Sequence, residues 1–119
     1  MSKLISLLLL NLTLMVAAGH AVESLDPYSH FFNETFGNFQ EELETAKSAG
    51  KKGIMIFFEM DECPFCHRMK KQVLNRPDVQ AWFRERFLLF PVDIEGDLEV
   101  TDFQGETTTQ KAFAFNLNP

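Results

Sequence analysis

The sequence predicts an α/β fold built on a parallel or mixed sheet. Two largely apolar runs, residues 54–58 and 87–94, have the continuous, partly β-branched composition of strands that are covered on both faces. Segments with helical spacing precede, separate and follow these runs. We therefore expect the order helix, strand, helix, short helix, strand, helix.

The part of the chain before the first strand divides into a lead-in and a helix. Residues 22–35, which include Pro27, are expected to be irregular. Apolar residues then recur at helical spacing: Phe39, Leu43 and Ala46. Asn38 is a suitable N-cap with Glu41 three residues later, and Gly50 is a suitable end. We expect a helix between Asn38 and Gly50.

The first strand, residues 54–58, leads into both cysteines of the chain. The motif Cys63-Pro64-Phe65-Cys66 follows it after four polar or flexible residues. Residues of one helical face then recur downstream: Phe65, Met69, Gln72 and Val73. We expect a helix that opens at the cysteine motif, runs to about Leu74 and turns this face inward.

A break at residues 75–78 separates the motif helix from a shorter one. Its apolar positions are Val79, Trp82 and Phe83, and Asp78 is the expected cap. Residues 87–94 then form the second strand. Pro91 cannot donate a backbone hydrogen bond, so we expect it at an edge, a bulge or a strand end.

The remainder of the chain is expected to be a polar loop followed by a helix. Residues 95–106 are polar and include two glycines. Thr107 or Thr108 is the expected cap of the last helix, whose apolar residues are Ala112, Phe113, Phe115 and Leu117.

The first 21 residues have the layout of a secretory signal peptide. Lys3 precedes a mostly apolar run at 4–18, and Gly19 and Ala21 are small residues at positions −3 and −1 of an expected signal-peptidase cleavage site. The run is shorter than the roughly 20 residues that span a bilayer, so a cleaved signal is favoured over a membrane anchor. We expect export, to a bacterial periplasm, with no stable membrane insertion after cleavage.

Composition narrows the function further. The net charge is −6 without a basic stripe, which argues against nucleic-acid binding. Thirteen phenylalanines supply a core for one small domain. Two cysteines three positions apart are too few for a disulfide scaffold, and closing so short a loop stabilises weakly. In an exported protein such a pair suggests a chemical role for the cysteines and not a structural disulfide.

Two chemistries fit the motif at residues 63–67. Cys63 and Cys66 form a C-x-x-C pair for dithiol–disulfide exchange, and with His67 they also form the attachment pattern of c-type haem. At the start of a helix the dipole favours a thiolate on the first cysteine, and Pro64 suits the first turn. In thiol–disulfide exchange, Cys63 would attack the substrate and Cys66 would resolve the mixed disulfide that forms.

Haem attachment is the alternative reading, in an electron-transfer protein. It needs His67 on the iron and a second ligand, for which the chain offers Met55, Met60 or Met69. The apolar strand-like runs on both sides of the motif fit a sheet better than a helical haem pocket. A zinc site with His30 and His67 is weaker, because the adjacent Cys66 and His67 point apart on a helix.

At these residues the sequence resembles the thioredoxin superfamily, and most of all its exported thioredoxin-like proteins. The resembling features lie within residues 36–117 and include the strand at 54–58, the C-P-x-C motif with its helix and the strand that ends at Val92-Asp93. The resemblance implies a central mixed sheet flanked by helices. It also implies exchange with protein thiol and disulfide substrates, a redox-recycling partner and no cofactor.

By this resemblance Cys63 and Cys66 are the catalytic residues and form the redox-active disulfide, whereas Pro64, Phe65, His67 and Glu59 belong to the motif or tune it. A redox-inert binding module with the same fold is a further alternative. Thioredoxins carry a buried acid six positions before the first cysteine. Here that position is Phe57, and Glu59 is the nearest acid.

The family also places a cis-proline loop, a β-hairpin and a terminal helix after the last helix expected here. The chain ends at Pro119. We therefore expect residues 36–119 to be an incomplete thioredoxin-like domain, the front part of a longer protein.

Overall fold

The structure is a computed structural model that describes residue 19 and residues 21–117. The expected signal peptide at 1–21 therefore lies almost entirely outside the described residues. Within the part of the chain that is described, no helix is long and apolar enough to cross a membrane.

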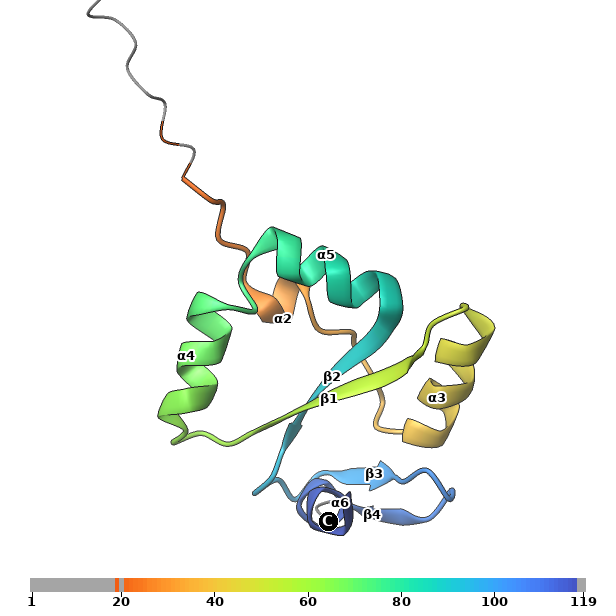
Figure 1. The fold of residues 1–119 in the computed structure, drawn as a ribbon. Helices are drawn as coiled ribbons and strands as arrows, with labels where there is room; N and C mark the ends of the chain where they lie inside the picture. Colours follow the sequence, from red (N-terminus) through yellow and green to blue (C-terminus); the bar gives the residue numbers. More distant parts are fainter. Residues whose placement is uncertain (1–18, 20, 118–119) are drawn as a thin grey trace, which may run out of the picture.

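A parallel pair of strands forms the centre of the fold (Figure 1). Strand β1 (Gly53–Glu59) pairs with β2 (Phe87–Asp93), with the two strands in register from the first residue to the last. The crossover between them contains two helices, α4 (Pro64–Gln72) and α5 (Pro77–Arg86). The α/β class is confirmed.

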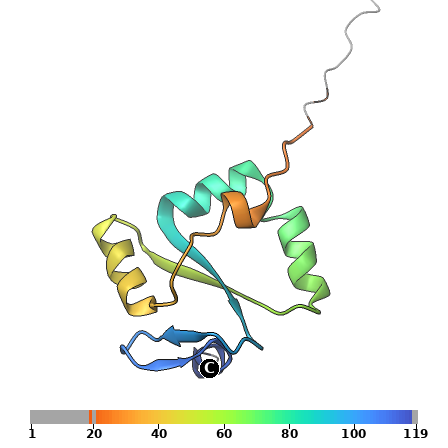
Figure 2. The ribbon, with the colours of Figure 1, turned by 180° about the vertical axis from the view of Figure 1, so that it is seen from behind.

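Helices cover both faces of this sheet. Because side chains alternate along a strand, Ile54 and Ile56 of β1 pack on one side and Met55 and Phe57 on the other. The first side carries α3 (Phe39–Ser48) and α6 (Gln110–Leu117), and the second carries α2 (Pro27–His30) and α5. The views in Figures 1 and 2 agree that α2 lies beside α5.

The helix expected between Asn38 and Gly50 is confirmed as α3. The Asn38 side chain accepts a hydrogen bond of 3.1 Å from the backbone N–H of Glu41. The preceding Gly37 has φ +85°, and a Cβ there would press on Glu99 and Val100, whose strand lies against it. Glycine is therefore required where the chain turns into the helix.

The cap expected at Asp78 is wrong. The N-cap of α5 is Arg76, two residues before Asp78; it makes no side-chain cap bond, and the helix starts at Pro77. Asp78 instead forms an ion pair of 2.8 Å with Arg76. Pro91 does lie on an edge strand, because β2 pairs with β1 alone among the strands described.

The segment at 95–106, expected to be a loop, contains a short strand. The strands form two separate sheets and not the single mixed sheet expected. Strand β3 (Glu99–Thr101) pairs antiparallel with β4 (Thr107–Thr109) in a separate small sheet. The expected caps Thr107 and Thr108 lie in β4, and Thr109 accepts a bond from Ala112 at the start of α6. Strands of three residues are too short to show a periodic pattern.

The lead-in at 22–35 differs from the irregular segment expected. It contains α2, and Phe31 and Phe32 behind that helix are buried against the sheet. Its backbone is fastened to α5, since the buried Gln80 amide donates to the Leu25 carbonyl at 3.0 Å and Arg84 donates to the His30 carbonyl at 2.9 Å. The segment is thus an integral layer of the domain.

Replacing Phe39 with alanine should lower the free energy of unfolding by about 3–5 kcal/mol. Phe39 is 2% exposed, and its ring stacks on Phe113 with centroids 4.5 Å apart. Urea denaturation followed by circular dichroism measures the loss. Phe36→Ala is the matched control, because the Phe36 side chain is fully exposed; its effect should stay under about 0.5 kcal/mol. Equal losses would contradict the core described above.

Candidate functional site

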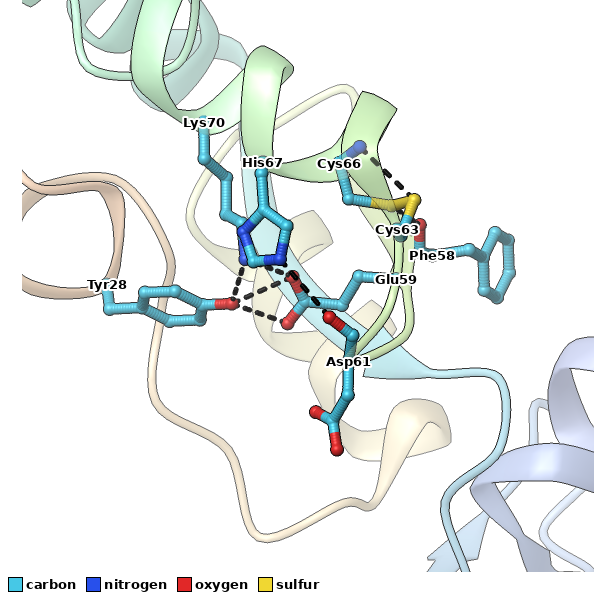
Figure 3. A network of polar contacts seen from close by, with 8 residues as sticks. All are labelled: Tyr28, Phe58, Glu59, Asp61, Cys63, Cys66, His67 and Lys70. Atoms are coloured by element: carbon cyan, nitrogen blue, oxygen red, sulfur yellow. Dashed lines mark hydrogen bonds and ion pairs between the residues drawn. A yellow bond between two sulfur atoms is a disulfide. The ribbon is translucent and has the colours of Figure 1, made fainter.

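The two cysteines lie where β1 gives way to α4, and they form a disulfide (Figure 3). Cys63 is the N-cap of α4, and its Cα lies 5.2 Å from that of Cys66. The backbone N–H of Cys66 donates to the Cys63 Sγ at 3.2 Å. One of the N–H groups that the first helical turn leaves unpaired is thus directed at the first sulfur.

The residues between and beside the cysteines follow the helix. Pro64 occupies the first turn, where its missing N–H costs no hydrogen bond. Phe65 points outward and is 81% exposed. Both cysteines are half-buried, so the structure does not place Cys66 in a clearly deeper position than Cys63. The Cys66 Sγ lies 4.0 Å from the Phe58 carbonyl oxygen at the end of β1.

The helical face expected to turn inward is exposed. Met69 is 41% exposed and Val73 is 39% exposed, and α4 has no fully buried residue. The expectation was wrong because α4 packs little against the two-stranded sheet. Phe65, Met69 and Val73 therefore form an apolar stripe that starts at the cysteines.

A polar cluster lies beside the disulfide, made of Tyr28, Glu59 and Lys70. The Tyr28 hydroxyl lies 2.6 and 2.7 Å from the two carboxylate oxygens of Glu59. The Lys70 amine donates to the Tyr28 hydroxyl at 2.8 Å and forms an ion pair of 2.9 Å with Glu59. The side chains of Glu59 and Lys70 are only 16% and 15% exposed. We call these three residues the Tyr28 cluster.

Strand geometry explains why these three groups meet. Glu59 lies two positions after Phe57 on β1, so both side chains face the side of the sheet that carries α2 and its Tyr28. Phe58 points the opposite way in Figure 3. Phe57, at the position where thioredoxins have an acid, packs its ring 5.7 Å from that of Phe32. The apolar Phe57 thus occupies that position, and the carboxylate on the same face of β1 is that of Glu59.

His67 contacts the loop before the motif. Its side chain is exposed, and its Nε2 lies 3.2 Å from the Asp61 carbonyl oxygen. A cavity of about 110 Å³ lies beneath it, lined by Tyr28, Glu59, Met60, Asp61, His67, Lys70 and Asp93. Among the described residues, no group of three or more histidine, cysteine or acidic side chains is placed to hold a metal ion.

The cluster shifts the titration of two of its members. Partial burial and the hydrogen bond to Glu59 raise the pKa of Tyr28, and they outweigh the opposing effect of Lys70. Burial acts against the charged amine of Lys70, but its hydrogen bonds to Tyr28 and Glu59 raise the pKa of Lys70 overall. Both groups therefore keep their protons to a higher pH than in an unfolded chain.

The sequence pointed to Glu59 but not to its partners. Lys70 carries a weak signal, since it follows Cys66 by four positions and so lies one helical turn away on the same side. Tyr28 carries no local signal, because only the packing of α2 brings it to the site.

A family model described as a thioredoxin-like domain matches residues 39–118. No curated protein and no solved structure gives a match. The matched region contains both strand pairs and the cysteine motif, whereas α2 precedes it.

Alkaline titration should follow the Tyr28 cluster directly. The chain has one tyrosine, so the near-ultraviolet absorbance of phenolate reports Tyr28 alone. Because its pKa is raised above 10.0, the folded protein should form phenolate at a higher pH than the same protein in urea. The raised pKa means that protonated Tyr28 adds to the free energy of unfolding. This contribution is complete below the pKa of tyrosine in the unfolded chain and is lost as the pH rises through the pKa of Tyr28 in the folded protein.

Glu59→Gln should lower this midpoint, because a neutral amide no longer opposes the negative phenolate. Asp61→Asn is the control, since the Asp61 side chain is outside the cluster. Identical midpoints for the folded and unfolded protein would contradict the hydrogen bonding described here.

Proposed function

The chain belongs to the thioredoxin-like family, and on that premise we propose that it is an exported thiol–disulfide oxidoreductase acting on protein substrates. The fold and a C-x-x-C disulfide are consistent with thiol–disulfide exchange. The proposal goes further, to catalysis, to proteins as the substrate class and to the roles of the two cysteines.

The observation that carries the proposal is the hydrogen bond from the Cys66 N–H to the Cys63 Sγ. In the reduced form the same N–H would donate to a Cys63 thiolate. A hydrogen bond to an ionised sulfur is stronger than one to a neutral sulfur, so the first turn of α4 favours the nucleophilic form. Cys63 is therefore the attacking residue.

Reduction of a substrate takes two exchange steps. The Cys63 thiolate attacks one sulfur of the substrate disulfide, forms a mixed disulfide and releases the other substrate sulfur as a thiolate. Cys66 then loses its proton and attacks the Cys63 Sγ, which restores the Cys63–Cys66 disulfide and releases the second substrate thiol. The reverse sequence oxidises a dithiol substrate, and a redox-recycling partner returns the pair to its starting state.

The neighbouring residues have supporting roles in this proposal. Phe65 is exposed between the cysteines and offers an apolar contact to a bound polypeptide. Pro64 starts the helix that activates Cys63. His67 holds the loop ahead of the motif through the Asp61 carbonyl, and the Glu59 carboxylate at the end of β1 is paired with Lys70 of the motif helix. The chemistry uses sulfur atoms of the chain and calls for no cofactor.

The proposed location rests on the N-terminal sequence. The layout of residues 1–21 supports export, and a bacterial periplasm is the compartment that we propose. An oxidising compartment allows the Cys63–Cys66 disulfide to persist between turnovers.

Substitution of each cysteine tests the proposed roles. Cys63→Ser should reduce turnover in an insulin-reduction assay to the uncatalysed rate, because no attacking thiolate remains. Cys66→Ser should also stop turnover but accumulate a mixed disulfide on Cys63, which mass spectrometry of the alkylated protein detects. Ser48→Ala, an exposed change at the end of α3, is the control and should match the wild type.

Two results would overturn the proposal. Full turnover in Cys66→Ser would remove Cys66 as the resolving thiol. A Soret band in the purified protein, together with cysteines that do not react with alkylating reagents after reduction, would instead support haem attachment.

A further inference from the structure

A segment outside the matched family region contributes a side chain to the candidate site. The match begins at residue 39, whereas Tyr28 lies in α2. Its hydroxyl reaches both carboxylate oxygens of Glu59 and accepts from Lys70. The Lys70 amine also lies over the Tyr28 ring, 4.9 Å from its centroid. One side chain from α2 thereby links the end of β1 to the motif helix.

The position of α2 is fixed by contacts that do not involve the site. The Leu25 N–H donates to the Asn75 carbonyl at 2.9 Å. On the other side of the helix, the Asn33 N–H donates to the Leu89 carbonyl at 2.7 Å, and the Asn33 side chain accepts from the Leu89 N–H at 2.9 Å. Tyr28 is thus presented by a segment that is anchored on one side to the turn between α4 and α5 and on the other side to β2.

The Tyr28 cluster is linked to the cysteines through both elements that carry them, the end of β1 and helix α4. Glu59 directly follows Phe58, whose carbonyl oxygen is 4.0 Å from the Cys66 Sγ. Lys70 is one turn of α4 beyond Cys66. Figure 3 shows the Glu59 carboxylate turned toward Tyr28 and Lys70. The cluster thus joins the end of β1 to the helix that carries both cysteines.

We propose that Tyr28, Glu59 and Lys70 are positioning residues that set the reduction potential of the cysteine pair, because Tyr28 and Lys70 hold and neutralise the Glu59 carboxylate. This inference rests on the proposed function. An uncompensated carboxylate beside the thiols would disfavour their ionised form. A less stable reduced form shifts the equilibrium toward the disulfide. The cluster thus keeps the dithiol form accessible.

Other charged groups surround the site and contribute a constant background. They are Asp61 and Glu62 in the loop, His67 and Arg68 on α4, and Asp93 at the end of β2. The variants below leave all of these groups unchanged, so differences in the dithiol–disulfide equilibrium among the variants come from the Tyr28 cluster.

A double-mutant cycle on Glu59 and Lys70 tests whether Lys70 neutralises the Glu59 carboxylate. The proteins are equilibrated with glutathione redox buffers at pH 7, and alkylation with mass spectrometry gives the reduced fraction. Lys70→Met should shift the equilibrium at least about threefold toward the disulfide, and Glu59→Gln at least about threefold toward the dithiol. The double variant should return to within about twofold of the wild type, since both charges are gone. A double variant displaced as far as Lys70→Met would overturn the inference.

Tyr28→Phe tests whether α2 contributes to the reduction potential, because this variant removes the hydroxyl that bonds to Glu59 and keeps the ring. It should shift the equilibrium in the direction of Lys70→Met, by a smaller factor, since the carboxylate loses one donor. Ser29→Ala is the matched control, because the Ser29 hydroxyl bonds only to Asp26 of the same helix. Circular dichroism verifies that each variant is folded. Equal equilibria for Tyr28→Phe and wild type would exclude α2 from the site.

The wild-type measurement separates this inference from the proposed function. If the wild type shows no glutathione-linked equilibrium between dithiol and disulfide, the proposed function fails and the inference fails with it. If the wild type equilibrates and Lys70→Met is unchanged, only the inference fails.

Discussion

The parallel pairing of β1 with β2 determines which face of the sheet each strand side chain near the candidate site occupies. Because side chains alternate on a strand, one register sends Ile54 and Ile56 toward α3 and α6 and sends Phe57 and Glu59 toward α2. A slip by one residue would place the Glu59 carboxylate on the face that carries α3 and α6, away from Tyr28. The apolar core that fixes this register therefore also fixes the chemistry at its end.

Features with a local cause were predictable from the sequence. Asn38 caps α3 because its side chain needs only an N–H three residues away. Pro64 lies in the first turn of α4 for an equally local reason. The two failures have different causes. Asp78 lies inside α5, which starts at Pro77, and pairs with the neighbouring Arg76. The face of α4 with Met69 stays exposed for a tertiary reason, because the sheet beneath it is narrow.

The same distinction applies to the candidate site. Cys63, Cys66 and His67 are recognisable from their spacing alone, because one turn of helix brings them together. Glu59 was identified only as the nearest acid, without its partners. Tyr28 lies 31 positions from Glu59 in the chain, so no window of sequence contains their contact. Only the packing of the aromatic residues behind α2 shows that the lead-in belongs to the site.

The crossover between β1 and β2 has a consequence for the order of folding. The two cysteines lie three positions apart, so they meet at the rate of a local loop closure. The Tyr28 cluster needs α2, β1 and α4 in place, which requires contacts between distant parts of the chain and forms more slowly. A newly made chain therefore has its two cysteines in contact before the Tyr28 cluster has formed. If the cluster sets the reduction potential, as proposed above, that potential changes as folding is completed.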